Sequence, residues 1–438
     1  MKKLIPQAIK NIYHLICSIG AVIWFGFPAR KIKVVGITGT NGKTTTIQMT
    51  ARILEEAGYK VAVSSTINFK IGDKEWVNKS KFTTRDAWQT QRFIQQAVSA
   101  GCDYLVLEVA SHALHQHRLW GIKFDVVAIT NVTREHLDYH KTILRYRKVK
   151  AKLFRMLKPA GSAVVNLEMD KPEEFIKASA GGKIYGYKIK EGGSEFKQDE
   201  LTVIQAEKLR MNLNSSEFTF NGVNFKLQLI GGFNVENALA AVSVGLSQGV
   251  DLQVASLALA KIKKIPGRMD YVANDRGLKI IIDYALTPDS MEKLGKLISE
   301  MIPGRAVIQN KEQKVANQII WVFGSCGERD RGKRPIMGEI VSRYADYVIV
   351  TNEDPYGEDP WQIIDEVYSG IKNLPEGKKS WRIMDRREAI KKALNLANKG
   401  DIILITGKGA EETMAVSATK RIKWNDRMVI VDLLKNKA

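Results

Sequence analysis

A glycine-rich turn followed by Lys-Thr-Thr lies near the start of the sequence, between an apolar run and a helical pattern. Residues 34–46 read VVGITGTNGKTTT. Glycines let backbone N–H groups point at phosphate oxygens, and a following helix turns its N-terminus toward the same anion. In such a turn Lys43 would reach the β- and γ-phosphates, and the Thr44 hydroxyl would bind Mg²⁺. The pattern predicts a nucleoside triphosphate site, with Ile37 where the strict phosphate-loop pattern has glycine.

The alternative is a glycine turn that binds nothing. It is less favoured because a strand pattern, a Gly-Lys-Thr core and a helical pattern coincide here.

Two further polar groups follow apolar runs. Glu108 lies near the end of the run Tyr104–Val109, and His136 comes shortly after the run Val126–Thr130. Ligand sites of open α/β sheets lie at the carboxyl ends of the strands, so both side chains are expected beside the phosphates. Glu108 is a candidate Mg²⁺ ligand, with a helix cap or surface acid as the alternative, and His136 is a candidate magnesium-site or phosphate-side ligand. The histidines at 112–117 lack the cysteines or spacing of a zinc site.

The composition narrows the class of partner. The chain has 438 residues, and 67 Lys and Arg against 47 Asp and Glu give a formal net charge of +20. This length suggests two or three domains. The basic balance fits phosphorylated ligands or a membrane surface, and no nucleic-acid-binding module accompanies it. The three cysteines are widely spaced, which favours a reducing cytoplasm over a disulfide framework.

The N-terminal segment is mostly apolar between Ile12 and Phe27 and is flanked by basic residues such as Lys10 and Arg30. A membrane-spanning helix needs about 20 apolar residues, so this run is borderline. We expect an interfacial or docking helix with basic flanks. A helix packed on the protein's own core is the equally weighted alternative.

From residue 32 onward, strand-like runs alternate with helical patterns, which predicts an α/β fold with a mostly parallel sheet. Residues 142–157 are expected to be helical, and residues 183–230 read as an antiparallel addition. Ile265-Pro266-Gly267-Arg268 marks a boundary, followed by a second, Rossmann-like α/β unit. We therefore expect an N-terminal helix segment (1–32), a central ATP-binding domain (33–266) and a C-terminal domain (267–438).

Ten motifs occur in an order that resembles the Mur ligases, and most closely the MurE class of UDP-N-acetylmuramoyl-tripeptide synthetases. They are TGTNGKTTT, EVASHAL, TNVTREHLDYH, GGFNVENALAA, PGRMD, DYALTPD, FGSCGERDRGKRPIMGEI, NEDPYGEDP, DRREAI and GKGAEE. The resemblance runs from about Lys33 to near the C-terminus. It implies a cytoplasmic ligase that couples ATP hydrolysis to amide formation through an acyl phosphate. Phosphate positioning, charge neutralisation by Mg²⁺ and exclusion of water are what that reaction requires.

The resemblance also implies roles for individual residues. Thr44 and Glu108 would hold one Mg²⁺, and Glu108, His136 and a carbamylated Lys150 would serve a second. Without the resemblance, Lys150 reads as part of a solvated basic helix face that includes Lys148 and Lys152. The implied nucleotide site comprises Gly39, Thr40, Asn41, Gly42, Lys43, Thr44, Thr45, Asn234, Asn237, Arg268 and Asp283. The implied substrate site comprises Thr83, Thr84, Ser111, Gln116, Arg118, Asp354, Tyr356 and Glu411.

The sequence departs from the MurE pattern in three respects. Only residues 1–32 precede the first expected strand, where that class carries a UDP-binding domain, so a lipid-linked acceptor becomes a candidate. Diaminopimelate-adding members have DNPR, whereas this chain has Glu353-Asp354-Pro355-Tyr356. Asp354 and Glu411 would suit a cationic side chain, so we expect a lysine-like amino acid to be added to a muramoyl-peptide acceptor. Leu286 and Ala410 also replace family histidines.

Two alternatives remain open at this point. A related ligase could act on another acid, in folylpolyglutamate, cyanophycin or MurT-like lipid II amidation. A non-catalytic, membrane-associated ATP-binding scaffold is less favoured because Lys43, Glu108, His136 and Lys150 are all present. We expect a monomer that makes peripheral membrane contact through its N-terminal helix, at the inner membrane face.

Overall fold

The computed structural model describes residues 6–80, 82–179, 182–189, 201–211, 215–302 and 317–435. The chain forms two compact units, which are described separately below. Unit 1 comprises residues 1–133 and 142–263, and unit 2 comprises residues 134–141 and 264–438. The chain passes from one unit to the other between Lys263 and Lys264, and the boundary expected from the sequence is between Pro266 and Gly267.

Unit 1 is built on a nine-stranded sheet with the order β4-β3-β2-β5-β1-β6-β7-β8-β9. The strands from β2 to β9 pair in parallel, while β3 and β4 pair antiparallel at one edge. Their bounds are β1 Lys33–Thr38, β2 Val61–Ser64, β3 Asn68–Ile71, β4 Lys74–Val77, β5 Tyr104–Glu108, β6 Phe124–Ile129, β7 Leu157–Asn166, β8 Lys183–Lys188 and β9 Leu201–Gln205. The central strand β1 is buried along nearly its whole length because helices cover both faces.

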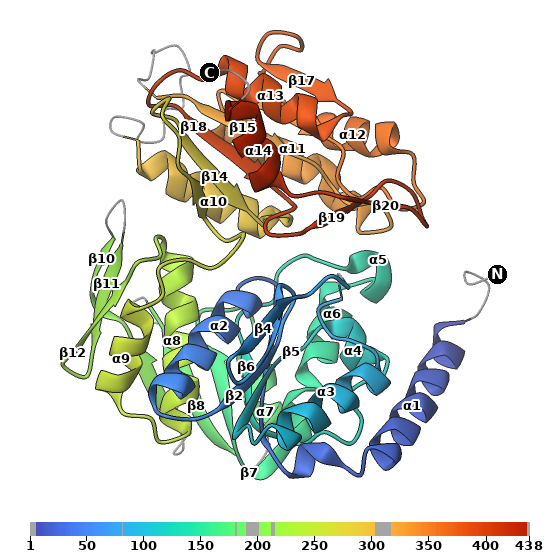
Figure 1. Cartoon of the computed structure of the whole chain (residues 1–438), viewed down its shortest axis with the longest axis vertical. Helices are drawn as coiled ribbons and strands as arrows, with labels where there is room; N and C mark the ends of the chain where they lie inside the picture. Colours follow the sequence, from blue (N-terminus) through green and yellow to red (C-terminus); the bar gives the residue numbers. More distant parts are fainter. Residues whose placement is uncertain are drawn as a thin grey trace. The chain divides into compact units, whose positions relative to one another are not determined.

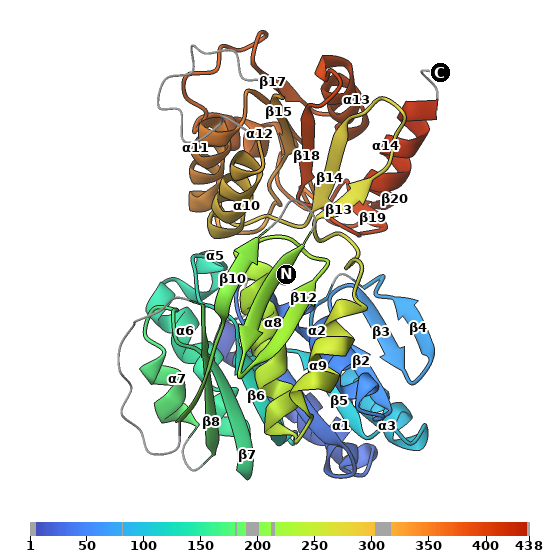
Figure 2. The same cartoon turned by 90° about the vertical axis from the view of Figure 1, so that its left-hand side faces the viewer.

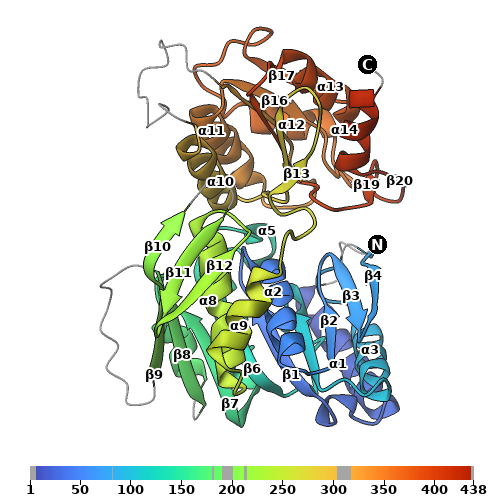
Figure 3. The ribbon, with the colours of Figure 1, turned by 60° about the vertical axis from the view of Figure 1, so that its left-hand side comes forward.

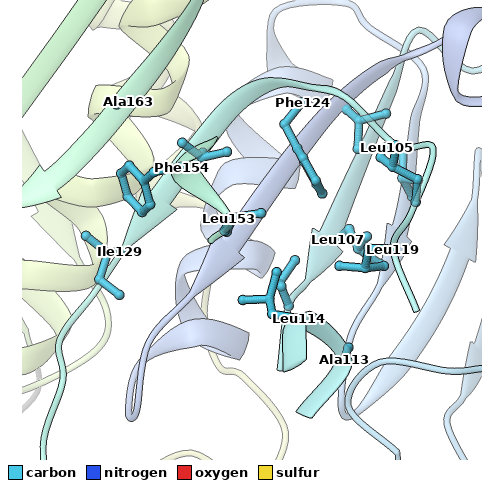
Figure 4. Close-up of a cluster of buried hydrophobic side chains, with 14 of the residues drawn as sticks. Leu105, Leu107, Ala113, Leu114, Leu119, Phe124, Ile129, Leu153, Phe154 and Ala163 are labelled. Carbon is cyan, nitrogen blue, oxygen red and sulfur yellow. The ribbon is translucent and has the colours of Figure 1, made fainter. Parts of the chain in front are cut away.

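Helices α2, α8 and α9 pack together on one face of this sheet, and α3, α4, α6 and α7 contribute to a core on the other (Figure 1). Figure 4 shows part of that core, in which Leu107, Leu119 and Phe124 gather with Leu153 and Phe154. The bounds are α2 Lys43–Glu56, α3 Ala87–Ser99, α4 Ser111–His115, α6 Ile143–Ala151, α7 Glu173–Ala178, α8 Gly232–Ser247 and α9 Leu252–Ala260, with short 3₁₀ turns at Pro28–Arg30 and Phe154–Met156.

Two expectations for this unit were wrong in detail. Strands β8 and β9 extend the main sheet in parallel, and a crossover through α7 brings the chain from β7 into β8 in the same direction. Only β10 (Glu207–Met211), β11 (Ser216–Phe220) and β12 (Val223–Leu227) form a separate antiparallel sheet, which packs on α9 (Figure 3). The helix expected over 142–157 ends at Ala151, and Leu157 already begins β7.

The N-terminal segment forms α1 (Gln7–Trp24), which lies along α3 (Figure 1). One side of α1 packs on the unit through the buried residues Ser18, Ala21 and Val22. The opposite side is apolar and exposed, with 56–75% of each residue accessible at Ile9, Ile12, Tyr13, Ile16, Ile23 and Trp24. At 100° per residue these six positions fall in a stripe roughly 120° wide. Among the described residues, no helix is both long enough and apolar enough to cross a membrane.

Unit 2 is a second doubly wound sheet with the order β13-β14-β18-β15-β16-β17, in which only β13 pairs antiparallel. Helices α10, α11 and α12 cover one face, and α13 and α14 cover the other (Figure 2). The strands are β13 Asp270–Val272, β14 Lys279–Asp283, β15 Ile319–Phe323, β16 Tyr347–Thr351, β17 Ser380–Ile383 and β18 Ile402–Thr406, with a hairpin of β19 Thr413–Ala415 and β20 Arg421–Lys423. The helices are α5 Leu137–His140, α10 Pro288–Glu300, α11 Arg334–Tyr344, α12 Pro360–Tyr368, α13 Arg386–Leu396 and α14 Asp426–Lys435, with a 3₁₀ turn at Arg331–Lys333.

Candidate nucleotide and ligation site

The phosphate loop joins the C-terminal end of β1 to the first residue of α2, which is Lys43. Its two glycines are required by close packing as well as by backbone conformation. A Cβ at Gly39 would lie 1.8 Å from Thr130 Oγ1, and a Cβ at Gly42, where φ is +83°, would lie 2.2 Å from Asn237 Oδ1. Because glycine has no Cβ, the backbone of the loop can approach its neighbours and a phosphate more closely than it could with any other residue at these two positions.

Asn131, which the sequence reasoning did not single out, holds the loop in place. Its carbonyl accepts a hydrogen bond from Thr40 N (2.9 Å), and its side-chain Oδ1 accepts one from Asn41 N (2.9 Å). Thr130 Oγ1 donates to Asn41 O at 2.6 Å. The signal in the sequence was the polar Thr-Asn pair directly after β6, the strand that neighbours β1.

The first turn of α2 carries the cation and hydroxyl of the predicted phosphate site. Lys43 Nζ donates to Thr40 O at 2.9 Å, so its ammonium lies over the loop. Thr44 and Thr45 are buried in the same turn. The turn therefore presents a positive charge, a hydroxyl and a helix N-terminus together, which is the requirement for binding a polyphosphate.

Glu108 lies at the end of β5, adjacent to β1, and is only 1% exposed. Its Oε2 accepts hydrogen bonds from Thr44 Oγ1 (3.1 Å) and Thr66 N (2.7 Å), and its Oε1 accepts one from Thr66 Oγ1 (2.8 Å). Thr66 was missed in the sequence because it follows a strand end without any motif around it. The pairing of a carboxylate with the hydroxyl after the loop lysine supplies the hard oxygen donors that Mg²⁺ prefers, so these residues fit that ion.

The residues expected to bind the acceptor form a connected group beside Glu108. Thr83 Oγ1 lies 3.0 Å from Thr66 Oγ1, and Thr84 Oγ1 donates to the Glu108 carbonyl (2.8 Å) while accepting from Ala110 N (2.9 Å). Arg118 Nη1 donates to Thr84 O at 3.3 Å, and Arg118 also pairs with Gln116 Oε1. Ser111 begins α4, directly after this end of β5. Five positions spread over 36 residues therefore meet at one strand end.

Lys150 belongs to the loop rather than to the solvated face of its helix. It is 1% exposed, its Nζ donates to Gly39 O at 2.6 Å, and the ammonium lies 4.5 Å from the centre of the Tyr146 ring. Lys148, two residues earlier, is exposed. The surface reading of Lys150 is therefore wrong.

Two asparagines of α8 lie on the other side of the loop. Asn237 Oδ1 accepts from Thr46 Oγ1 at 3.3 Å and is the group that packs against Gly42. Asn234 Nδ2 donates to Ile230 O at 2.8 Å, and both asparagines are buried.

His136 lies in the segment 134–141, which groups with unit 2. Glu135, next to it, forms a buried ion pair with Lys333, whose Nζ donates to both carboxylate oxygens at 3.1 Å, and Arg134 pairs with Asp330 at 3.1 Å. His136 itself has a left-handed backbone with φ of 57°. Its expected place beside Glu108 stays a prediction.

In unit 2, Arg268 and Asp283 lie close together around β14. Asp283 accepts hydrogen bonds from Met269 N and Ala285 N, both at 2.8 Å. Burial raises the pKa of Asp283, and the nearby Arg268 limits the rise. The Arg268 guanidinium lies 4.6 Å from the centre of the Tyr284 ring.

Asp354 and Glu411 share a buried lysine, which the sequence reasoning did not anticipate. Lys408 Nζ donates to Asp354 Oδ2 at 2.8 Å and pairs with Glu411 Oε2. The remaining oxygens are also engaged, because Asp354 Oδ1 accepts from Ala415 N (2.6 Å) and Glu411 Oε1 accepts from Tyr284 OH (3.1 Å). Burial opposes the lysine's charge, but the carboxylates of Glu411 and Asp354 outweigh it and raise the pKa of Lys408. The three groups together carry one net negative charge rather than two.

Tyr356 lies beside a second residue that was missed. The Arg329 guanidinium is 5.8 Å from the centre of the Tyr356 ring, so a cation is present near the position where the DNPR motif has arginine. Asp354 and Tyr356 both have positive φ, 42° and 51°, which is uncommon for residues other than glycine and marks a tightly determined loop.

Comparisons with known proteins show which family the chain is similar to. The Mur ligase middle domain matches residues 37–245, and the Mur ligase, glutamate ligase domain matches residues 267–409. A UDP-N-acetylmuramoyl-L-alanyl-D-glutamate–2,6-diaminopimelate ligase of Syntrophomonas wolfei is 36% identical over 95% of this chain and 81% of that protein. A UDP-N-acetylmuramyl-tripeptide synthetase of a Roseiflexus species is 36% identical over 93% of this chain and 79% of its own length.

Solved structures show the same fold. A UDP-N-acetylmuramoyl-L-alanyl-D-glutamate–2,6-diaminopimelate ligase matches with a TM-score of 0.58 and 31% identity over 93% of this chain and 79% of its own. A folylpolyglutamate synthase of Mycobacterium tuberculosis matches with a TM-score of 0.69 at 16% identity, over 91% of this chain and 96% of its own, and shows the fold alone. The two domain matches, the relatives and the phosphate loop lead to one conclusion: the chain belongs to the Mur ligase family of ATP-dependent peptide ligases.

Proposed function

We propose that this enzyme adds an amino acid to the carboxylate of a muramoyl-peptide cell-wall precursor in the cytoplasm. The observation that carries the proposal is the Thr44–Glu108 pair at the phosphate loop, joined through Thr66 to Thr83 and so to the expected acceptor residues. An acceptor carboxylate bound by the expected acceptor residues would lie next to the γ-phosphate held by Lys43. The names of the relatives at 36% identity support a muramoyl-peptide acceptor.

The chemistry assigned to this arrangement is the formation of an acyl phosphate, followed by attack of an amine. Lys43 and the loop N–H groups would hold the transferring phosphate, and Arg118 would orient the acceptor. Bound Mg²⁺, which Thr44 and Glu108 would hold, supplies charge neutralisation. Residues 33–266 would form the ATP-binding domain, with Asn234 and Asn237 toward the base, and residues 267–438 the amino-acid-binding domain.

A screen of acceptors tests the proposal. The enzyme is incubated with ATP, Mg²⁺ and amino acids, and with UDP-linked muramoyl dipeptide, lipid-linked muramoyl dipeptide or a folate acid. Phosphate release and product mass are measured. We expect turnover with a muramoyl acceptor, and either carrier is compatible with the assignment. Turnover with the folate acid alone would refute it.

We propose that Lys150 is carbamylated in the active enzyme. Its amine would add to CO₂ and lose a proton, so that a buried cation becomes an anion next to the phosphate loop. Its burial and its 2.6 Å contact with Gly39 O support a role at the loop. Stripping CO₂ should lower activity, isotope-labelled bicarbonate should give a carbamate signal in the NMR spectrum, and Lys150→Ala should be partly rescued by a small carboxylic acid. Full activity of Lys150→Ala would contradict this.

We propose that the incoming amino acid carries a side-chain amine, as lysine does. The net negative charge left by Asp354 and Glu411 after pairing with Lys408 supports a cationic partner. Tyr356 offers no charge to a second carboxylate. One observation favours meso-diaminopimelate as the second candidate: Arg329 lies near Tyr356.

Competition between lysine and meso-diaminopimelate separates these candidates, with Arg329→Gln as the diagnostic variant. We expect mainly the lysine product from the unmodified enzyme, and little effect of Arg329→Gln on lysine. A mainly diaminopimelate product that Arg329→Gln suppresses would establish the second candidate. A site that binds one polar group discriminates strongly against an analogue that leaves it unpaired.

We propose that the exposed stripe of α1 contacts the inner face of an anionic membrane. The exposed apolar residues and the basic residues that follow the helix, such as Arg30 and Lys31, support an interfacial helix. Flotation with vesicles of phosphatidylglycerol and phosphatidylcholine tests it. Ile12→Ser with Ile16→Ser should abolish flotation, whereas Leu257→Ser with Met428→Ser, at positions of similar exposure, should not. Failure of the unmodified protein to float would refute the contact.

A further inference from the structure

Two cavities lie side by side on the face of unit 1 that carries α4, α6 and α7. The first, here called the apolar cavity, has a volume of about 280 Å³ and is lined by Ala113, Leu114, His117, Leu119, Trp120, Gly121, Ile122, Lys123, Lys152 and Met156. The second, here called the basic hollow, has a volume of about 530 Å³ and is lined by Lys148, Val149, Ala151, Lys152, Arg155, Glu174 and Lys177. Lys152 lines both. No residue of either cavity belongs to the ligation site described above.

The apolar cavity opens over the hydrophobic core. Ala113, Leu114 and Leu119 in its wall belong to the core cluster shown in Figure 4. The cavity also adjoins α1, because Gly121 packs so closely on Val22 that a Cβ there would lie 2.8 Å from Val22 Cγ2. A chain of CH₂ groups placed here would leave water for an apolar surface, which is favourable.

The basic hollow has an excess of positive charge that its one acid does not offset. Glu174 is paired with Arg147, whose Nη1 lies 3.1 Å away and whose side chain does not line the hollow. Lys148, Lys152, Arg155 and Lys177 remain, and none of these four has an ion pair within the described part of the chain. Four cationic side chains therefore gather around the basic hollow, and an anion bound there would reduce the repulsion between them.

We propose that the two cavities form one site for a single-chain lipid phosphate, with the chain in the apolar cavity and the phosphate in the basic hollow. Lys152, at their junction, contacts the phosphate where it joins the chain. Each cavity is comparable in size with small-molecule sites, which are roughly 300–1,000 Å³. The separation of apolar and cationic walls selects an amphiphile over either a neutral lipid or a free phosphate. The site is independent of the proposed membrane contact of α1 and of the proposed ligation chemistry.

Binding of dodecyl phosphate to the full-length protein, measured by calorimetry below its micelle concentration, tests this site. Inorganic phosphate and neutral dodecyl maltoside serve as the two half-ligands. We expect dodecyl phosphate to bind at least tenfold more tightly than either. Equal binding of dodecyl maltoside, or equal binding of inorganic phosphate, would overturn the proposal.

Variants that remove positive charges test whether the basic hollow binds the phosphate group. Lys152→Met keeps an unbranched four-atom stem without the charge and should weaken the binding of dodecyl phosphate about tenfold. The triple variant Lys148→Gln with Arg155→Gln and Lys177→Gln should weaken it on the order of 10²-fold. A matched triple of exposed lysines elsewhere in unit 1, Lys74→Gln with Lys208→Gln and Lys263→Gln, should leave binding unchanged. Unaltered affinity in the first triple, or equal losses in both, would overturn the proposal.

Two further arms separate this site from the other proposals. Ile12→Ser with Ile16→Ser should retain dodecyl phosphate binding even where vesicle flotation is lost, and loss of both would assign the ligand to α1 instead. ATP binding by the same variants should be unchanged because none of the substituted residues lines the phosphate loop, and thermal unfolding checks that each variant is folded.

Discussion

Replacing Glu108 by glutamine separates the charge of this residue from its structural role. The carboxylate accepts three hydrogen bonds, from Thr44 Oγ1, Thr66 N and Thr66 Oγ1. A glutamine can place its carbonyl oxygen where Oε2 accepts two of them, and its amide can donate to Thr66 Oγ1, which then donates to Thr83. The hydrogen-bonding pattern survives while the negative charge is lost.

The expected magnitudes differ for function and for stability. Loss of a group that stabilises transition-state charge costs about 3–4 kcal/mol, or roughly 10²–10³ in rate. The free energy of unfolding of Glu108→Gln should change by about 1 kcal/mol or less, since no donor is left without a partner. Glu108→Ala should instead lose about 1–3 kcal/mol, because it removes the acceptor of the Thr66 N–H.

Three measurements decide the outcome. ATP binding is titrated with Mg²⁺ and with a chelator, phosphate release is followed in a single turnover, and unfolding is followed in denaturant. We expect Glu108→Gln to lose the Mg²⁺ dependence of ATP binding while it unfolds normally. Thr66→Val, which keeps the carboxylate, should retain that dependence. A Glu108→Gln enzyme with normal Mg²⁺ dependence and release within tenfold of the unmodified protein would refute the assignment.

Three other expectations follow from the same geometry. Lys43→Ala should lower ATP-dependent ligation by roughly 10²–10³ through loss of charge on the phosphates, measured by phosphate release with the unfolding midpoint as control. Gly42→Ala should cost at least about 1–2 kcal/mol, seen in thermal unfolding, because φ is +83° and the new Cβ meets Asn237 Oδ1 at 2.2 Å. Burial raises the pKa of Glu353 in the folded state above its value in the unfolded state. Between these two pKa values the folded state binds more protons than the unfolded state. The protonated carboxyl therefore contributes stability at low pH, and this contribution is lost as the pH rises through the folded pKa. Glu353→Gln should therefore gain stability relative to the unmodified protein as pH rises from acidic to neutral values in denaturant titrations, and a pH-independent difference would contradict this.

The sequence determined the family, the α/β class and the position of the phosphate loop. Those features depend on residues that are close together along the chain: a strand, its glycine turn and the first turn of a helix. The local sequence reveals such a segment because the glycine turn and the lysine are contiguous with the strand and the helix that they join. The close packing of Gly39 on Thr130 and of Gly42 on Asn237 became visible only in the tertiary structure. The order of the ten motifs predicted the same family along nearly the whole chain.

Pairings between distant residues were decided by the tertiary structure. Thr66 reaches Glu108 across 42 residues, and Lys408 lies between Asp354 and Glu411, so an acidic pair expected to attract a cation already holds one. Register and crossover direction made β8 and β9 parallel, which the alternation of polar and apolar residues along a strand cannot report. The hydrophobic periodicity of α1 was compatible with a packed helix and with an exposed helix. In the structure one side of α1 packs on unit 1 and the opposite side is exposed. Burial depends on how the layers of the fold pack together, so the sequence alone does not report it. Only the tertiary structure therefore shows the exposed apolar stripe of α1, the buried position of Lys150 and the position of Lys152 between two cavities.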